Sequence, residues 1–422
     1  MKSLTSARAA LCGLFALAVL ATGCKKELDD YYTEQGPQYP GFLNLLPAPA
    51  TKYATGETVT FELQFAQQTD PIKQIVILQK VEPNRDSTVV QTLPYKPAYS
   101  RIKRTDTLMV NYVVPAGANK ALVRVDARVD SNNGQTKLRT FYFRLAEATP
   151  TIVINSGPTN VTVPAGGSSA PGDIVRYNVT LNAGGITTAP IPPSTSAVPT
   201  GTLYKDLDSL VVYAKVGTAA ERRVVRIKTA ASGAQLTQNV DVPLPAGSAG
   251  QPVTLRFEAK VRTPARTASV TAPATITPVA ATPFSSTVRT ATLTYTGATG
   301  GDLAAYDLTT FATVAAADPA TSKDLAITST ATNQVQFKAL STNTKLVKST
   351  TAVYNAATLT SIRQTYNATA AASQVTTLDN VLVGDVIIAK LRGLDQYVAM
   401  QVAGINRTSA TDVAVTLNIK AL

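Results

Sequence analysis

The sequence predicts an all-β chain: two repeated immunoglobulin-like β-sandwich domains followed by a third, different antiparallel β-domain. Three observations predict it. Apolar and polar side chains alternate over short runs, which is the period of a half-buried strand. Gly, Pro, Asn, Asp and Ser interrupt these runs about every 8 to 12 residues, and no long helical period occurs. One series of strand patterns also occurs twice in the same order, and a chain of 422 residues exceeds the usual size of a single core.

Residues 1–23 predict a signal peptide. Lys2 and Arg8 precede the apolar run 9–21, which at 13 residues is too short to cross a bilayer as a helix. The run ends in Leu-Ala-Thr-Gly-Cys, which resembles a bacterial lipobox. The resemblance implies that Cys24 is lipidated and begins the mature chain. No intrachain disulfide is then expected, because Cys12 leaves with the signal peptide. An ordinary signal peptide with an incidental cysteine is the alternative.

Residues 24–40 are expected to form a tether, since 31–40 contains turn formers and no apolar period. The block Lys-Lys-Glu-Leu-Asp-Asp at 25–30 resembles the export signal of surface lipoproteins of the Bacteroidetes type. The resemblance implies an outer-membrane protein that is anchored through lipid on Cys24 and displayed at the cell surface. The periplasmic face of that membrane is the alternative location, and a plain solvated spacer would have the same composition.

An internal repeat predicts the two sandwich domains. An apolar strand pattern, the turn tripeptide Pro-Ala-Gly and a strand of alternating apolar and charged residues each recur 130 to 135 residues further along the chain, at 75–81 and 210–216, at 115–117 and 245–247, and at 123–129 and 255–261. We therefore expect one sandwich at 41–147 and its repeat at 150–278. Within the repeat, residues 184–201 are rich in Pro, Thr and Ser and are expected to form a flexible insertion.

The third domain is expected at 286–422, after a Pro-, Ala- and Thr-rich linker. It ends in a predicted antiparallel meander, and further strands with one short helix at most are expected before it. This part is similar to the C-terminal β-domain of Bacteroidetes-type surface lipoproteins, including the HmuY-like haem-binding ones. No haem is expected here, because the chain has no His, and Met109 and Met400 fall in different predicted domains.

The composition argues against an enzyme. Without His, the chain has no imidazole to act as base, acid or ligand, which excludes Ser-His-Asp and Cys-His hydrolysis. A zinc site lacks ligands, and the carboxylates are too scattered for a calcium loop, with Asp206 and Asp208 forming only a single pair. Sandwich glycosidases usually line their subsites with aromatic residues, and this chain has no Trp. We expect no catalytic residues, no metal and no cofactor.

The formal net charge of +12 comes partly from basic runs at 101–104, 222–228 and 260–266. Where their period is two, strands would place them on one exposed face that could attract anionic polysaccharide or lipid head groups. Solvated edge residues that block aggregation are the other interpretation. Nucleic acid is not expected, since no reader motif accompanies the charge. Tyr, with 16 residues, is the most abundant aromatic and could stack on sugars or pack in cores.

These expectations combine into one functional prediction. The chain is a non-enzymatic, lipid-anchored cell-envelope protein that acts as a surface binding or adhesion module for a glycan or a macromolecular partner. The alternative is an accessory lipoprotein of an outer-membrane transport or secretion complex, which would recognise a protein partner through an exposed strand edge or through 184–201.

Overall fold

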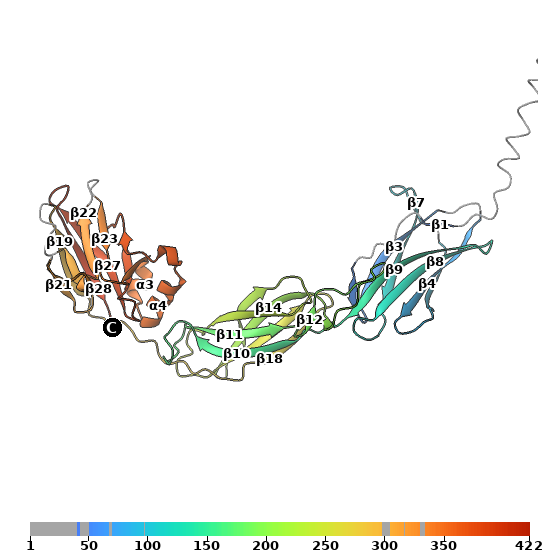
Figure 1. The fold of residues 1–422 in the computed structure, drawn as a ribbon, viewed down its shortest axis with the longest axis horizontal. Coiled ribbons are helices and arrows are strands. Elements are labelled where there is room, and N and C mark those ends of the chain that lie inside the picture. The colour runs from blue at the N-terminus through green and yellow to red at the C-terminus, as the bar shows by residue number, and fades with distance from the viewer. Residues whose placement is uncertain are drawn as a thin grey trace, which may run out of the picture. The chain divides into compact units, whose positions relative to one another are not determined.

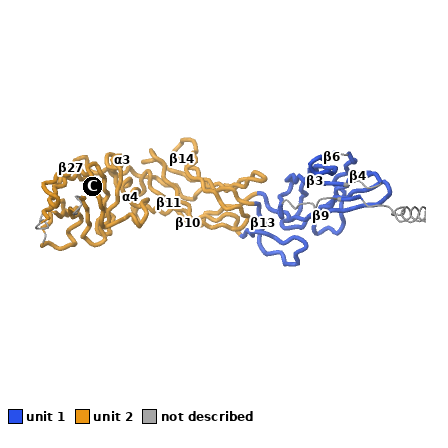
Figure 2. The backbone as a smooth tube through the Cα atoms, turned by 90° about the horizontal axis from the view of Figure 1, so that it is seen from above, with its two compact units in different colours: residues 1–148, 184–205 blue, residues 149–183, 206–422 orange. Residues whose placement is uncertain are grey.

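The computed structural model describes residues 40–42, 50–66, 70–96, 98–297, 304–315, 317–329 and 334–422. The predicted signal peptide, Cys24 and almost the whole tether lie outside the described residues. The chain forms two compact units (Figure 2). Unit 1 comprises Met1–Ala148 and Gly184–Lys205, and unit 2 comprises Thr149–Ala183 and Asp206–Leu422. The prediction of an all-β fold with two immunoglobulin-like sandwiches and a different third domain is confirmed (Figure 1).

The first sandwich, in unit 1, packs two sheets around an aromatic core. One sheet has the order β1-β3-β7-β6 and the other the order β2-β9-β8-β4-β5. Phe143 meets Tyr53 edge to face at 5.1 Å between ring centroids. The strands are β1 (Gly41–Phe42), β2 (Lys52–Ala54), β3 (Thr58–Ala66), β4 (Ile72–Val81), β5 (Thr88–Pro94), β6 (Tyr99–Ser100), β7 (Thr105–Val113), β8 (Leu122–Ser131) and β9 (Thr136–Ala146).

The second sandwich, in unit 2, has sheets of order β10-β11-β16 and β15-β14-β17-β18. Tyr177 and Phe257, both fully buried, meet edge to face between the sheets at 5.1 Å. The strands are β10 (Ile152–Asn160), β11 (Ile174–Leu181), β14 (Leu207–Val216), β15 (Arg222–Lys228), β16 (Leu236–Pro243), β17 (Val253–Val261) and β18 (Arg266–Thr271).

The two sandwiches repeat one strand pairing. β4 pairs antiparallel with β8, and β14 pairs antiparallel with β17. Each first strand carries a bulge at the corresponding place, after Ile72 and after Leu207, where Ile72 faces Ser131 and Leu207 faces Val261. In the structure, Val261 therefore corresponds to Ser131. The charge pattern of the sequence instead matches Val261 to Val129, which lies two residues before Ser131. Because side chains alternate with period two, this shift leaves each residue on its predicted face.

Residues 184–201 differ from the expectation of a flexible insertion in the second sandwich, because the structure groups 184–205 with unit 1. There β12 (Gly185–Ile186) pairs in parallel with β13 (Thr202–Leu203). Leu203 is buried against Ala146 of the first sandwich and exchanges two hydrogen bonds with Asn119, at 2.9 and 3.0 Å. A segment with few apolar residues is thus held by hydrogen bonds to its backbone, which composition does not reveal.

A buried ion pair closes this segment onto the first sandwich. The Lys205 ammonium lies 3.0 Å from the Glu57 carboxylate, and the two side chains are only 11% and 9% exposed. Glu57 also accepts a hydrogen bond of 2.8 Å from the Ala54 amide. The Lys205 ammonium lies 5.2 Å from the centre of the Tyr53 ring, within the range of a cation–π contact.

We expect Lys205→Met to destabilise unit 1 by about 2 kcal/mol, because the buried Glu57 carboxylate loses the ammonium group that pairs with it while the aliphatic stem is kept. Thermal unfolding and proteolysis within 184–205 measure the effect. Lys96→Met, at an exposed lysine of the same unit, is the control and should change neither. Equal behaviour of the two variants would show that the pair does not hold the segment.

The third domain, in unit 2, contains two five-stranded sheets, of order β19-β28-β27-β26-β24 and β21-β20-β22-β23-β25. Two α-helices are present where one at most was expected. The elements are β19 (Arg289–Tyr295), β20 (Ala305–Asp307), β21 (Ala312–Val314), β22 (Leu325–Ser329), β23 (Val335–Lys338), β24 (Lys345–Ser349), α3 (Thr351–Asn355), α4 (Leu359–Ala368), β25 (Thr377–Leu378), β26 (Val386–Lys390), β27 (Tyr397–Arg407) and β28 (Val413–Lys420), with short 3-10 turns at Ala320–Ser322 and Ala371–Ser373.

Strand β26 is buried on both faces, which explains its unbroken apolar run. Ile387 belongs to the core between the two sheets, whereas Ile388 packs against Ile362 and Tyr366 of α4 on the other side. Thr358 begins α4 with a capping box to Ser361, so the helix start is fixed locally. The meander predicted at the C-terminal end is present, because β26 pairs with β27 and β27 with β28.

Candidate functional site

The second sandwich places two separate basic runs of the sequence on one sheet face. In the pairing of β14 with its neighbours, Ser209 lies between Lys228 of β15 and Lys260 of β17. Further along β14, Val211 lies opposite Arg226 of β15 and Tyr213 lies opposite Arg223. We call this surface the basic face. It comprises the basic side chains that the strand register places on this side of the sheet and those that continue it beyond the strand ends: Arg223, Arg226, Lys228, Arg256, Lys260, Arg262 and Arg266.

Asp208 organises one end of the basic face. Its carboxylate accepts hydrogen bonds from the Arg262 guanidinium at 2.6 Å and the Ser209 hydroxyl at 3.1 Å, and Arg226 lies 3.5 Å away. The Ser209 hydroxyl, together with the two guanidinium groups, holds the pKa of Asp208 below its ordinary value. One carboxylate is therefore shared by two arginines, which leaves an excess of positive charge at this end.

Two open hollows flank Asp208 on the basic face. The first, of about 390 Å³, is lined by Asp208, Arg226, Lys228 and Arg262. The second, of about 490 Å³, is lined by Lys260, Arg262 and Arg266 with short neutral residues between them. Lys228 makes no ion pair among the described residues, and Arg262 is largely exposed although it contacts Asp208. Cationic groups that face solvent in a shallow hollow can bind carboxylate or sulfate groups.

Carboxylates offset most of the positive charge at the other end of the basic face. Arg256 donates hydrogen bonds to Glu221 and to Glu258, and these two carboxylates raise its pKa above the ordinary value. Its guanidinium also stacks on Tyr213, 4.5 Å from the ring centre. Glu258 is shared with Lys260 at 2.8 Å. An anion would therefore be attracted mainly to the end of the face that Asp208 organises.

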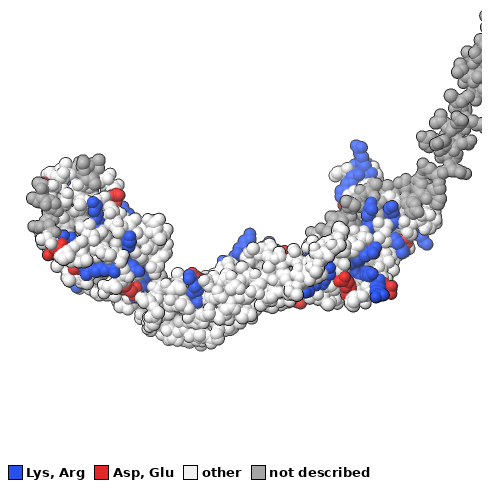
Figure 3. All heavy atoms as spheres, viewed as in Figure 1, with Lys and Arg blue, Asp and Glu red and all other residues white. Residues whose placement is uncertain are grey.

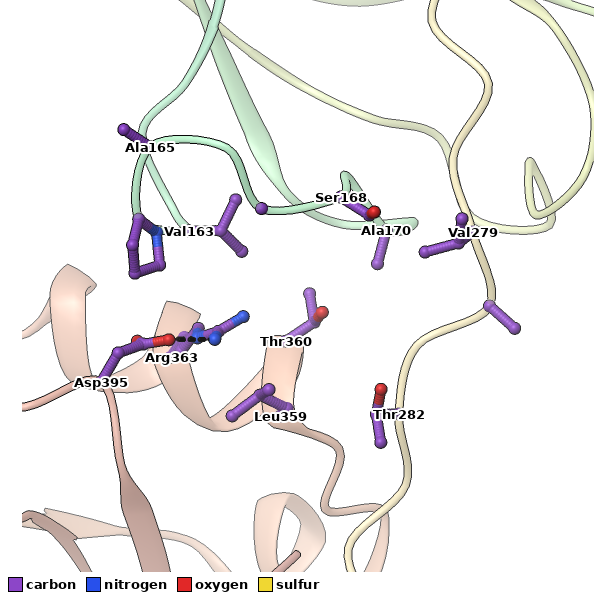
Figure 4. A pocket seen from close by; sticks show the side chains of 13 residues that line it. Val163, Ala165, Ser168, Ala170, Val279, Thr282, Leu359, Thr360, Arg363 and Asp395 are labelled. Atoms are coloured by element: carbon purple, nitrogen blue, oxygen red, sulfur yellow. Dashed lines mark hydrogen bonds and ion pairs between the residues drawn. The ribbon is translucent and has the colours of Figure 1, made fainter.

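Unit 2 also contains a crevice of about 440 Å³, shown in Figure 4. Arg363 of α4 and Asp395 lie at one side of it and pair with each other, with 2.9 Å between Arg363 Nε and Asp395 Oδ1. Side chains such as Val163, Ala170 and Thr360 form much of the remaining wall. Its two charges neutralise each other, so the crevice offers less to a charged ligand than the basic face does.

The structure separates the residues that the sequence singled out. The basic runs 222–228 and 260–266 come together on the basic face, whereas 101–104 lies in unit 1. Asp208, noted only as half of an acidic pair, contacts arginines instead of a second carboxylate. Met109 lies in unit 1 and Met400 in the core of unit 2. Cys24, the one predicted modification site, is outside the described residues.

The described residues hold no group of three or more His, Cys, Asp or Glu side chains that could bind a metal ion. Within the same residues, no helix is both long enough and apolar enough to span a bilayer.

Comparisons with known proteins assign the chain to no family. No family model matches the chain, and no curated protein matches it. A DUF4466 family protein from Parabacteroides merdae is similar over 66% of this chain and 100% of its own, at 12% identity and a TM-score of 0.22. The FN1–FN3 domains of chicken CNTN1 are similar over 90% of this chain and 99% of their own, at 11% identity and a TM-score of 0.22. A two-domain fibronectin type III segment of chicken tenascin is similar over 56% of this chain and 99% of its own, at 10% identity and a TM-score of 0.19.

Proposed function

We propose that the chain is a non-enzymatic, lipid-anchored cell-envelope protein that binds an acidic glycan through the basic face. The observation that carries the proposal is the convergence of two distant basic runs around Asp208. Neutral sugars are generally bound on aromatic side chains, and the only aromatic residue that the register assigns to this face, Tyr213, lies under Arg256. Carboxylated or sulfated sugars suit guanidinium and ammonium groups, which bind their oxygen atoms directly.

The anchoring half of the proposal rests on the sequence. The lipobox-like segment before Cys24 supports lipidation, and the basic and acidic block after it supports export to the cell surface. The sequence of residues 286–422 resembles HmuY-like β-domains, and this resemblance would fit a lipoprotein of the same general kind. We expect no haem in that domain, since the chain has no His.

The binding half is tested with two polysaccharides that share one backbone. We expect the mature chain to bind polygalacturonate and not its fully methyl-esterified form, because esterification removes the carboxylate charge and leaves the sugar rings. Biolayer interferometry with immobilised polysaccharide measures both. Equal binding to the two forms would refute an anion-directed site. Binding to neither, together with co-purification with an outer-membrane complex, would favour the accessory role.

The anchoring half predicts that Cys24→Ala releases the protein from the membrane fraction of its native cells. Protease treatment of intact cells should remove the wild-type protein while a periplasmic control protein survives. A Cys24→Ala protein that still fractionates with membranes would overturn lipid anchoring. Protection of the wild type until the outer membrane is opened would overturn surface display and leave anchoring in place.

A further inference from the structure

The hairpin between β6 and β7 exposes an apolar residue among cations. Its tip, 101–104, carries Ile102 with 95% of the side chain exposed, and Tyr99 just before the tip is 64% exposed. Arg101 and Arg104 are exposed and make no ion pair among the described residues, while Lys103 pairs with Glu62. Figure 3 shows Lys and Arg side chains gathered on the projection that bears this hairpin. An apolar apex with flanking cations suits a surface that is anionic outside and apolar beneath.

Strand register places this tip at the end of the sheet where the chain enters it. In the β1-β3-β7-β6 sheet, Gly41 pairs with Ala66 at the end of β3, and the neighbouring row joins Phe65 to Asp106 and Asp106 to Tyr99. The hairpin tip continues beyond this row. The first residue of β1 and the hairpin therefore share one end of the sheet, about 14 Å apart at three strand spacings.

The distance along the chain brings the same end of the sheet close to the proposed anchor. Pro40, which immediately precedes β1, lies only 16 residues after Cys24 in the chain. A fully extended chain of that length reaches about 55 Å, and any less extended chain reaches less. An acyl anchor at Cys24 would therefore hold this end of the first sandwich within that reach of the membrane.

We infer that the β6–β7 hairpin is a second membrane contact, which inserts Ile102 into an anionic lipid surface and fixes how unit 1 stands on it. The inference rests on the proposed anchoring, because the anchor supplies the high local concentration that a single weak contact needs. Arg101 and Arg104 bind anionic head groups, and Ile102 enters the acyl boundary beneath them. The opposite end of the sandwich, which bears the β4–β5 turn, faces away from the lipid.

A fluorescent label beside the apex tests this contact. Ser100→Cys, labelled with an environment-sensitive NBD group, leaves Ile102 in place, and Arg85→Cys in the β4–β5 turn gives the control label. Both proteins are attached to vesicles containing phosphatidylglycerol, either by the native acyl anchor or by a hexahistidine segment that replaces residues 1–24 on nickel-chelating lipid. The second attachment makes the result independent of lipidation.

We expect the label at residue 100 to emit at shorter wavelength and to be quenched by spin-labelled acyl chains, while the label at residue 85 is unaffected. Ile102→Asp should abolish the shift, as should Arg101→Glu with Arg104→Glu. Val113→Asp, which changes another exposed apolar residue at the far end of β7, should retain it. Identical signals at residues 100 and 85 on the histidine-anchored protein would overturn the contact. If the histidine-anchored protein bound the vesicles and the acyl-anchored protein did not, lipid anchoring would be overturned and the contact would stand.

Discussion

Arg226→Glu with Lys228→Glu is expected to weaken binding of polygalacturonate on the order of 100-fold. Both side chains line the hollow beside Asp208, and reversal replaces two attractions by two repulsions. At about 1 kcal/mol or slightly more for each reversed charge near a protein surface, the total loss is about 2 to 3 kcal/mol. Titration of the polysaccharide into wild type and variant measures the ratio of dissociation constants.

A matched control separates a local contact from a change in net charge. Lys73→Glu with Arg85→Glu alters the net charge by the same amount at exposed positions of the first sandwich. We expect this variant to bind within about twofold of the wild type, since neither residue belongs to the basic face or lines its hollows. If both double variants lost affinity equally, the attraction would be diffuse and the basic face would not be a site.

The largest expected loss of stability follows from Asp324→Ala in the third domain. Asp324 has no exposed surface and accepts hydrogen bonds from the Arg392 guanidinium at 2.8 and 3.1 Å and from the Thr344 hydroxyl at 3.1 Å. Asp324, and after it Asp307, raise the pKa of Arg392 above its ordinary value. Removing Asp324 leaves a partly buried guanidinium with one carboxylate, which we expect to cost about 3 kcal/mol.

Hydrogen exchange of the β22 and β26 amides measures this loss within the intact chain, without assuming that all domains unfold together. Asp318→Ala, at an exposed aspartate of the same domain, is the control and should change protection only locally. Unchanged exchange in Asp324→Ala would show that Arg392 finds sufficient partners without it.

The strands could be predicted because their signal is local. Residues 253–261 alternate between buried and partly exposed, so period two alone identified β17 and the faces of its side chains. The same pattern does not fix pairing to a single residue, and the predicted match of the repeats was therefore two residues out of register. A buried run such as 386–390 does not alternate, so its assignment as a strand depended on the turn and the alternating strands that follow it in the predicted meander.

Long-range contacts could not be predicted in this way. The sequence shows Lys205 only as one residue near a Pro-rich stretch. Its partner Glu57 lies in the other predicted sandwich domain, almost 150 residues earlier. Likewise, Asp208 joins Arg226 and Arg262 only because β14, β15 and β17 end side by side. The basic runs were a usable signal for the candidate site, while the carboxylate that organises them gave no signal in the sequence.

The salt dependence of polygalacturonate binding by the full mature chain tests the central claim most directly. If cations of the basic face bind carboxylates, the logarithm of the association constant should fall steeply and linearly with the logarithm of salt concentration, as counterions are released. The Arg226→Glu and Lys228→Glu variant should show a shallower slope. Binding that does not change between low and high salt would contradict the account, because the glycan would then be held by contacts other than charge.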